Sequence, residues 1–241
     1  MLKRIVFFLF AFTAIANAQV RPGVKLGYNL GGVFGRIPEN VTRNHYTHGH
    51  PDNFKIMSGF QVGMIADCPI NDAFAIQPGV RFAMNGFTDE YRSGAPSGAS
   101  VIRRFSFFYL QVPVYAQYRW NVYEETNVLF QAGPYAGLGL FGRQSIHRNG
   151  RSIDLNDGQR KIEFNEDFNR MFDYGISFGV GIEYNRFQLV MAYDLGLSQN
   201  NFHKRDAHSG SYNVDLRNHN FSVTLAVIFG RRDPLQSQRD W

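Results

Sequence analysis

The sequence predicts an all-β fold: an eight-stranded antiparallel up-and-down transmembrane β-barrel with four long extracellular loops and short periplasmic turns. Three observations predict it. Eight segments alternate apolar and polar residues with a period of two, which is typical of strands with two different faces. Long and short connections alternate strictly between these segments. The polar faces carry mostly Gly, Ser, Ala and Gln, which suit a crowded interior better than a solvated exterior.

The composition excludes a disordered chain. Of the 241 residues, 44% are hydrophobic and 19% are charged, which is enough apolar material for a folded core. The single cysteine, Cys68, excludes an intramolecular disulfide and a zinc site built from thiolates. The formal charge of +5 falls to +3 without Lys3 and Arg4, so nucleic acid is not an expected partner.

The first 18 residues have the layout of a cleavable secretory signal peptide. Lys3 and Arg4 precede the apolar run 5–15, and Ala16-Asn17-Ala18 supplies a cleavage motif. The apolar run is shorter than the ~20 residues that a membrane-spanning helix needs. We therefore expect a signal peptide at 1–18, an outer-membrane β-barrel at 19–230 and a short periplasmic C-terminal tail at 231–241.

The first four predicted strands cover residues 22–34, 55–66, 73–84 and 105–120. Each places apolar side chains at even positions, and in the first three strands the odd positions carry mainly glycine, glutamine, asparagine or an isolated charge. Central apolar residues of these strands are, in order, Leu26, Val62, Val80 and Val112. The strands reach the ~9–11 residues that a tilted strand needs to cross a bilayer.

The last four predicted strands cover residues 128–141, 174–184, 187–197 and 219–229. The apolar positions remain even in the first two of them and become odd in the last two. Central apolar residues are, in order, Phe130, Val180, Met191 and Val223. Small and polar residues stand between them, so every strand has one apolar and one polar face.

The connections determine the expected orientation. Long polar segments occupy 35–54, 85–104, 142–173 and 198–218, and short segments rich in Asn, Asp and Pro occupy 67–72, 121–127 and 185–186. All long connections then fall at one end of the barrel and all short ones at the other. This is the layout of an outer-membrane barrel whose turns and termini face the periplasm.

Aromatic residues gather near both ends of the predicted strands, as in the girdles of outer-membrane barrels. At the turn end they are Phe74, Tyr118, Trp120, Tyr184, Phe187 and Phe229, and at the loop end Phe34, Phe54, Phe87, Phe105 and Phe172. A soluble periplasmic barrel that binds an apolar ligand would share the alternation, with the apolar face turned inward. We keep it as an alternative fold and function.

Three stretches carry a family likeness: GVKLGYNL at 23–30, FYLQVPVYAQY at 108–118 and GVGIEY at 179–184. Through them the whole mature chain resembles the PorT-like outer-membrane β-barrel (porin-family) proteins of the Bacteroidetes. The resemblance implies an eight-stranded barrel in the outer membrane of a Gram-negative cell. One namesake is tied to type IX protein secretion, so the resemblance also implies an alternative function as an accessory component of a secretion apparatus.

An eight-stranded barrel is only wide enough for its own side chains, so we expect a closed lumen. The polar residues expected to face it are Lys25, Gln61, Gln77, Arg81, Gln111, Gln131, Glu183 and Asp194. These should form a packing network, because unpaired buried charge is costly. Arg81 and Asp194 lie at similar depth on two upward strands, so we expect them to meet. We also expect Gln111→Ser to be mild.

Other candidate sites carry less support. The loop residues His45, His48, His50 and Asp52 are a candidate divalent-metal set, but their spacing fits no established site and such loops are usually solvated. The histidines at 147, 203, 208 and 219 have serines nearby, but the strand pattern brings no serine and histidine together. The glycines at 137–142 match a dinucleotide-binding expression without a following helix. We therefore expect no catalytic set, no metal and no cofactor.

The third long segment carries four arginines that are candidates for surface recognition: Arg143, Arg148, Arg151 and Arg160. Guanidinium groups suit contact with lipopolysaccharide phosphates or with a partner protein. The expected partners are outer-membrane lipid, lipopolysaccharide and other envelope or secretion proteins. The expected function is a structural or interaction role at the cell surface, without enzymatic activity.

Overall fold

Strands dominate the computed structural model, which describes residues 20–36, 54–92, 100–148, 151–152, 159–162, 172–198, 200–206 and 210–230. The strands in these segments are β1 (Arg21–Arg36), β2 (Phe54–Pro69), β3 (Phe74–Arg92), β4 (Ser100–Tyr123), β5 (Thr126–Arg148), β6 (Arg151–Ser152), β7 (Gln159–Ile162), β8 (Phe172–Tyr184), β9 (Phe187–Gly196), β10 (Asn200–Asp206) and β11 (Gly210–Ile228). No helix in the same segments is long and apolar enough to cross a membrane.

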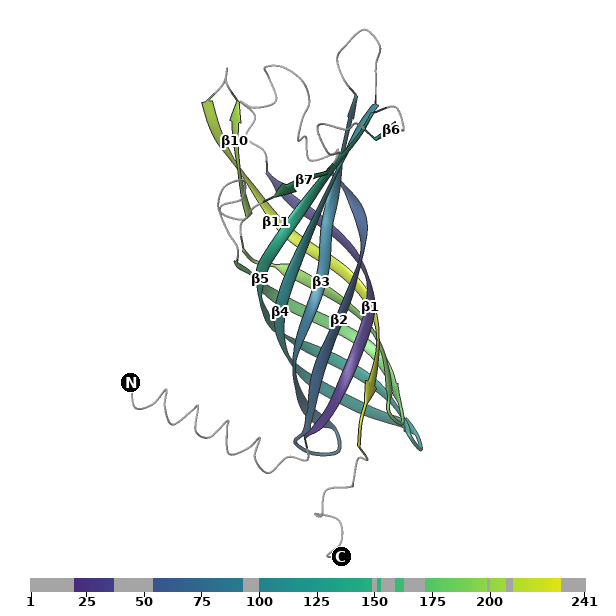
Figure 1. Cartoon of the computed structure of the whole chain (residues 1–241). Helices are drawn as coiled ribbons and strands as arrows, with labels where there is room; N and C mark the ends of the chain where they lie inside the picture. The colour runs from purple at the N-terminus through teal and green to yellow at the C-terminus, as the bar shows by residue number, and fades with distance from the viewer. Residues whose placement is uncertain are drawn as a thin grey trace, which may run out of the picture.

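Eight of these strands form a closed antiparallel ring, which confirms the predicted fold class (Figure 1). The order around the ring is β1, β2, β3, β4, β5, β8, β9 and β11, and β11 pairs again with β1. Closure gives every ring strand two partners, so the ring has no open edge. The short turns lie at the lower end of Figure 1, where the chain also enters β1 and leaves β11. We call this the turn end, and the opposite end the outer end.

The strand pairing also fixes the width of the barrel. Successive register partners that start at Asn127 of β5 pass around the whole wall and return to Gly137 of the same strand. The displacement is ten residues (137 − 127), which for eight strands corresponds to a strand tilt of roughly 40°. A barrel of this size has room inside only for its own side chains.

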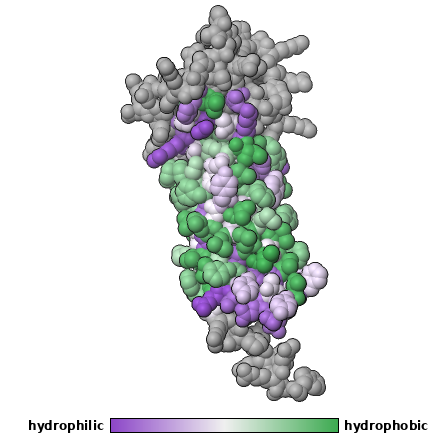
Figure 2. Space-filling model, turned by 90° about the vertical axis from the view of Figure 1, so that its right-hand side faces the viewer, coloured by the Kyte–Doolittle hydropathy of each residue, from purple (hydrophilic) through white to green (hydrophobic). Residues whose placement is uncertain are grey.

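The apolar face of the wall points outward, as predicted. The large apolar side chains of all eight ring strands are exposed, for example Leu26 at 64% and Met64 at 67%. On the face seen in Figure 2, such side chains form a hydrophobic band between two hydrophilic ends. The soluble alternative is therefore wrong, because that barrel would place its apolar face inside.

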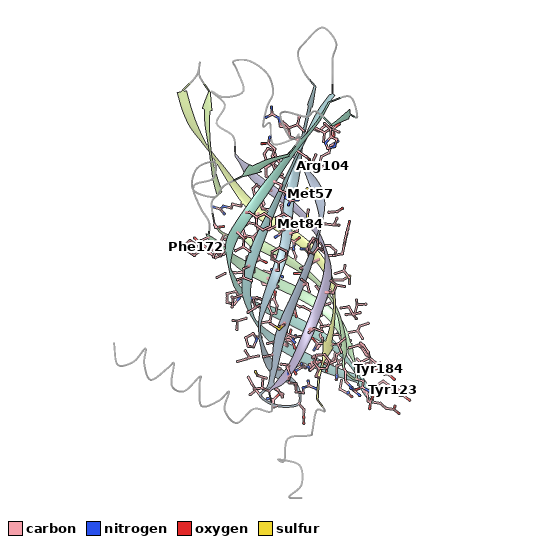
Figure 3. The ribbon with its side chains drawn as sticks, viewed as in Figure 1. Met57, Met84, Arg104, Tyr123, Phe172 and Tyr184 are labelled. Carbon is pink, nitrogen blue, oxygen red and sulfur yellow. The ribbon has the colours of Figure 1, made fainter. Side chains whose placement is uncertain are left out.

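Aromatic side chains mark the turn end of the hydrophobic band. All six aromatic residues predicted for this girdle are exposed. Phe74 and Tyr118 pack against each other with ring centroids 5.1 Å apart. Tyr123 and Tyr184 extend from the wall at the same end (Figure 3). These amphipathic and apolar rings suit the boundary between lipid and water.

The outer-end girdle differs from the predicted one. Phe34 and Phe172 are exposed, but Phe87 is only 2% exposed and stacks on Phe105 at 4.9 Å. The reason is that β3 runs on to Arg92, so the alternation carries Phe87 to the lumen side. An outward stack that includes Phe82, Phe108 and Phe141 lies on the outer face instead.

The strands extend further toward the outer end than predicted. Residues placed in the predicted loops 85–104, 142–173 and 198–218 pair as strands, as in Tyr91 with Val101 and Val101 with Arg148. β7 and β6 pair with the outer part of β5, and β10 pairs with the outer part of β11. Backbone hydrogen bonds sustain a ladder without apolar alternation, so the hydropathy pattern ended before the strands did.

The turns at the turn end confirm the short connections. Two of them are two-residue links, at Glu124-Glu125 and Asn185-Arg186. Glu124 and Asn185 have φ angles of 38° and 53°, in the left-handed region. In the third, the side-chain oxygen of Asn71 accepts hydrogen bonds from the backbone N–H groups of Ala73 and Phe74. Such Asx contacts replace backbone hydrogen bonds in tight turns.

Candidate functional site in the barrel lumen

The lumen is lined by polar and charged side chains from all eight ring strands. Seven of the eight residues predicted to face it are buried, and Gln131 is half-buried. Their contacts form two separate layers rather than the single predicted network. The first layer centres on Arg81 and the second on Asp67 and Arg119.

Arg81 is the centre of the first layer. Its Nη2 donates to Asp194 Oδ2 at 2.7 Å, and its Nε donates to Gln111 Oε1 at 2.7 Å. Its Nη1 donates to Gln61 Oε1 at 3.1 Å, and its guanidinium carbon lies 5.7 Å from the ring centre of Tyr135. The structure thus brings Arg81 and Asp194 together in the geometry of a buried ion pair.

The contacts of Gln111 change one sequence-based expectation. This side chain is 1% exposed and its amide oxygen accepts the Arg81 Nε proton. Serine would be too short to reach the guanidinium, and a buried donor would lose its acceptor. From this contact we instead expect Gln111→Ser to destabilise the barrel.

Lys25 belongs to the same layer. Its ammonium lies 5.3 Å from the centre of the Tyr115 ring, a cation–π arrangement, and the Tyr115 hydroxyl lies 3.4 Å from Arg81 Nη1. Asn220 Nδ2 donates to Asp194 Oδ2 at 3.2 Å. The layer therefore links β1, β2, β3, β4, β9 and β11 through buried polar side chains.

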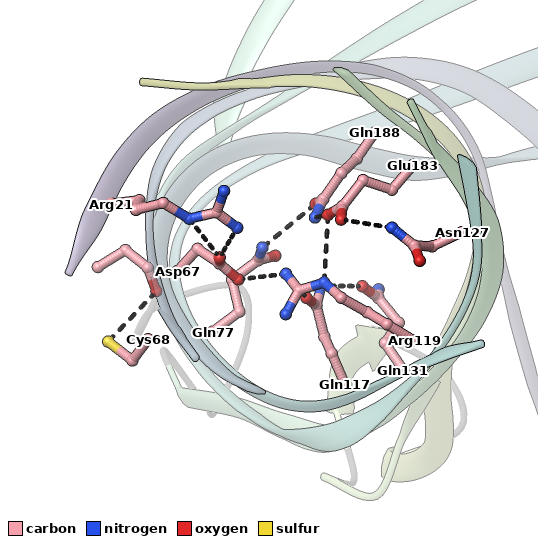
Figure 4. Close-up of polar contacts among 11 residues, drawn as sticks. Arg21, Asp67, Cys68, Gln77, Gln117, Arg119, Asn127, Gln131, Glu183 and Gln188 are labelled. Atoms are coloured by element: carbon pink, nitrogen blue, oxygen red, sulfur yellow. Dashed lines mark hydrogen bonds and ion pairs between the residues drawn. The ribbon is translucent and has the colours of Figure 1, made fainter. Parts of the chain in front are cut away.

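The second layer lies toward the turn end and contains two ion pairs to one carboxylate (Figure 4). Asp67 Oδ2 accepts from Arg21 Nη2 at 2.5 Å, and Asp67 Oδ1 accepts from Arg119 Nη2 at 2.5 Å. Arg119 Nε donates to Glu183 Oε2 at 3.2 Å. Glu183, predicted to join Arg81 and Asp194, is therefore part of this other layer.

Amide side chains complete the second layer (Figure 4). Gln188 Nε2 donates to Glu183 Oε2 at 2.6 Å, and Asn127 Nδ2 donates to Glu183 Oε1 at 3.2 Å. Gln77 donates to Gln188 at 3.2 Å. Amides can donate and accept at once, so they extend the hydrogen-bonded layer without adding charge.

The predicted lumen set lacked the amides Asn127 and Gln188 and three charged residues of this layer: Arg21, Asp67 and Arg119. Arg21 and Asp67 lie just outside the predicted strands, although both belong to strands in the structure. Arg21 and the lumen-facing Lys25 are both odd-numbered residues of one strand, and so are Asp67 and the lumen-facing Gln61 on the next strand. Arg119 and Gln111 are related in the same way. Residues of equal parity on one strand face the same side. This parity is the signal that would have identified them.

The structure places the four candidate surface arginines on strands rather than in a loop. Arg143 and Arg148 lie on β5, Arg151 on β6 and Arg160 on β7. Arg148 pairs with Arg151, and Gln144 pairs with Arg160. Arg143 alternates with Gln144 along β5, so the four positions do not share one side of the sheet. The Arg143 side chain itself is exposed.

The candidate metal residues at 45–52 lie outside the described residues. Among the residues that are described, no group of three or more His, Cys, Asp or Glu side chains could hold a metal ion. The described histidines at 147 and 203 lie on β5 and β10, where strand pairing has replaced the predicted loops, and His219 lies on β11, within the predicted strand 219–229.

The two layers together describe what the lumen can do chemically. Each contains at least one buried ion pair whose partners come from strands that are not neighbours in the ring. A polar vestibule of about 630 Å³, lined in part by Arg21, Asn127 and Glu183, opens at the turn end and reaches the second layer. Arg81, Gln111 and Gln61 occupy the lumen beyond it, where a diffusing solute would have to separate buried charges.

Residues 12–201 match the family model described as "Outer membrane protein beta-barrel domain". No curated protein matches the chain. Several solved structures are similar over most of both chains. Neisserial surface protein A is 13% identical over 86% of this chain and 97% of its own, with a TM-score of 0.41. The attachment invasion locus protein Ail of Yersinia pestis is 13% identical over 87% and 98%, with a TM-score of 0.36. OprG from Pseudomonas aeruginosa is 12% identical over 87% and 94%, with a TM-score of 0.40.

Proposed function

Because the chain belongs to the family of outer-membrane protein β-barrel domains, we propose that it is a closed barrel with a structural or interaction role at the cell surface. Its location is the outer membrane, as the family and the hydrophobic band indicate.

The observation that carries the proposal is the pair of charged layers across the lumen. To open a path, Arg81 would have to leave Asp194, and Arg119 would have to leave Asp67 and Glu183. Separating one buried ion pair leaves two uncompensated charges and costs about 3–5 kcal/mol. This cost supports a closed lumen in the resting barrel rather than a diffusion channel.

Conductance tests the closed lumen. We expect the full mature barrel, reconstituted in a planar bilayer in concentrated KCl, to give no conductance above that of the bare lipid. The control is Lys55→Ala/Glu90→Ala, which removes an exposed ion pair at the outer end and should behave identically. Stable open-channel steps in the wild type would contradict a closed resting state.

The interaction role is supported by the outer extension of the sheet. β3, β4 and β5 continue as paired strands at the outer end of the barrel (Figure 1). Arg104 and Arg143 are exposed on this extension, and their register partners, Ser145 and Ser106, place them on one side of it. Paired guanidinium groups there suit the phosphates of lipopolysaccharide.

The test is lipopolysaccharide retention. Arg104→Glu/Arg143→Glu should lower the amount of lipopolysaccharide that copurifies with the barrel from native membranes. A charge reversal at the turn end, Arg186→Glu, is the matched control and should retain the wild-type amount. Equal retention by all three proteins would contradict lipopolysaccharide recognition by this surface.

The accessory role in secretion rests on the family resemblance alone, and no described contact adds to it. We expect no enzymatic activity, because the lumen charges are engaged in ion pairs and amide contacts rather than presented to a substrate.

A further inference from the structure

The outer face of the barrel wall contains a hollow of about 620 Å³ across β4, β5, β8 and β9. Two alanines of its lining, Ala116 of β4 and Ala132 of β5, are exposed and are partners in the strand register. The side chains around these alanines are larger and also exposed: Phe74, Tyr118, Phe130, Phe178, Val180 and Tyr193. Small residues between large ones therefore leave a depression in the lipid-facing surface.

Two rows of register partners form the sides of the hollow. The row nearer the turn end passes through Tyr118, Phe130, Val180 and Met191. The row nearer the outer end passes through Ala116, Ala132, Phe178 and Tyr193. Between the rows, Gln117 and Gln131 turn their amide groups toward the lumen, where Gln117 donates to Gln131 at 3.3 Å. The surface of the hollow is therefore almost entirely apolar.

The hollow runs obliquely from the turn-end girdle toward the middle of the bilayer. On β4 its side begins at the girdle residue Tyr118. On β8, Val180 stands four residues (184 − 180) from the girdle residue Tyr184, and on β9, Met191 stands four residues (191 − 187) from Phe187. Four residues of a strand tilted by roughly 40° rise about 10 Å along the barrel axis. The hollow thus covers most of the ~15 Å that one leaflet contributes to the hydrocarbon core.

An alkyl chain matches the chemistry and the course of this hollow. Among the described residues that border it, none is charged, so it offers no site for a headgroup. Lipid tails are as apolar as the wall, so attraction between them depends on van der Waals contact. A chain that lies in the depression gains contacts on several sides, whereas an empty depression forfeits them. The course from the girdle inward is that of a lipid chain whose ester end lies at the interface.

We propose that the hollow binds one acyl chain of a glycerophospholipid from the leaflet at the turn end. The ester end of the chain lies at the girdle near Phe74 and Tyr118, whose ring centroids are 5.1 Å apart. The chain then crosses Ala116 and Ala132 toward Tyr193, and the rings on both sides slow its exchange with the surrounding lipid. This binding is independent of the closed lumen and of the proposed surface role, which involve the interior and the outer end.

Native mass spectrometry of the full mature barrel tests the proposal, in a detergent whose eight-carbon chains compete weakly. The probe is 1-palmitoyl-2-oleoylphosphatidylcholine, added in steps. We expect one lipid to bind saturably to the wild type, and its affinity to fall at least fivefold in Ala132→Phe, whose ring fills the hollow. The matched control is Ala136→Phe, at an exposed position of β5 outside the hollow, which should bind as the wild type does.

Chain length is the second readout. A phosphatidylcholine with two hexanoyl chains should bind the wild type at least fivefold more weakly, because short chains cannot extend along the hollow. Equal affinity for the two lipids would show that the headgroup is bound instead, and would overturn the proposal.

The variants give further outcomes that would count against an acyl-chain site. Equal affinity in the wild type and Ala132→Phe would do so, and so would an equal loss in Ala136→Phe. Displacement of the phospholipid by lipopolysaccharide at equal concentration would assign the hollow to the other leaflet. A wild-type dimer that Ala132→Phe abolishes would assign it to a second copy of the chain. If Ala132→Phe does not fold, as judged by heat-modifiable migration, Ala116→Phe replaces it with the same expected loss.

Discussion

The guanidinium of Arg81 and the carboxylate of Asp194 meet at 2.7 Å across the lumen, although β3 and β9 lie four steps apart in a ring of eight strands. The ion pair therefore joins opposite walls of the barrel. Both side chains are almost fully buried, so solvent screens the interaction little.

Coupling between these two residues is the first prediction. Removing either partner leaves the other as a buried charge, and each of Arg81→Ala and Asp194→Ala should lower the unfolding free energy by about 3–5 kcal/mol. The double variant should lose less than the sum of the single losses, by about 1–3 kcal/mol. Urea unfolding in lipid vesicles, followed by tryptophan fluorescence, measures all three.

The exposed pair Lys55 and Glu90 is the control for that cycle. Lys55 is 62% exposed in its side chain, so water screens the attraction. The coupling energy of this pair should lie within about 1 kcal/mol of zero. Additive losses at Arg81 and Asp194, similar to those at the control pair, would show that the lumen pair is not coupled.

The lipid-facing positions give the second prediction. Leu110 and Val180 lie near mid-strand on the outer face and are 41% and 42% exposed. Leu110→Arg and Val180→Arg should each lower the unfolding free energy by about 2–4 kcal/mol, because a charge near the bilayer midplane loses its hydration. Tyr123→Arg, at the turn end, should cost about 0–1 kcal/mol. Equal costs at the two depths would contradict the assigned position of the bilayer.

A close approach of two backbones gives the third prediction. A Cβ on Gly133 of β5 would overlap the carbonyl oxygen of Val114 on β4, so the strands must separate to accept it. Gly133→Ala should lower the unfolding free energy by about 1–3 kcal/mol. Gly179→Ala is the comparison, since its Cβ would lie 3.0 Å from the nearest atoms and should cost less. Heat-modifiable migration on a gel gives the folded fraction of both variants, and equal folded fractions would argue against the close approach.

The turn residue Glu124 gives the fourth prediction. Its φ angle of 38° lies in the left-handed region, which costs a side-chain-bearing residue about 1–2 kcal/mol. Glu124→Gly should raise the unfolding free energy by about 0.5–1 kcal/mol, since glycine adopts this conformation without strain. Glu125→Gly, at a position without a left-handed φ, should lower it by a similar amount. The same urea titration tests both, and a loss in Glu124→Gly would contradict the reading of the turn.

The alternation of side chains identified the eight ring strands and their lumen faces from sequence. Lys25, Arg81, Gln111, Glu183 and Asp194 are all buried where the period of two placed them. This succeeds because the direction of a side chain along a strand depends only on the strand itself. The same rule failed at Phe87, where the end of the apolar pattern was taken as the end of the strand.

The partners of those side chains were decided by the tertiary structure. The pairing of Arg81 with Asp194 could be predicted from the sequence. Both strands start at short turns, so the number of residues from the turn gives the depth of each side chain in the lumen. The pairing of Glu183 with Arg119, and of Asp67 with Arg21, was not. Which charges meet across the lumen depends on the ten-residue displacement around the ring, and that displacement is the sum of the registers of all eight strand pairs. The sequence by itself therefore determined which residues face inward, and only the closed barrel determined which of them touch.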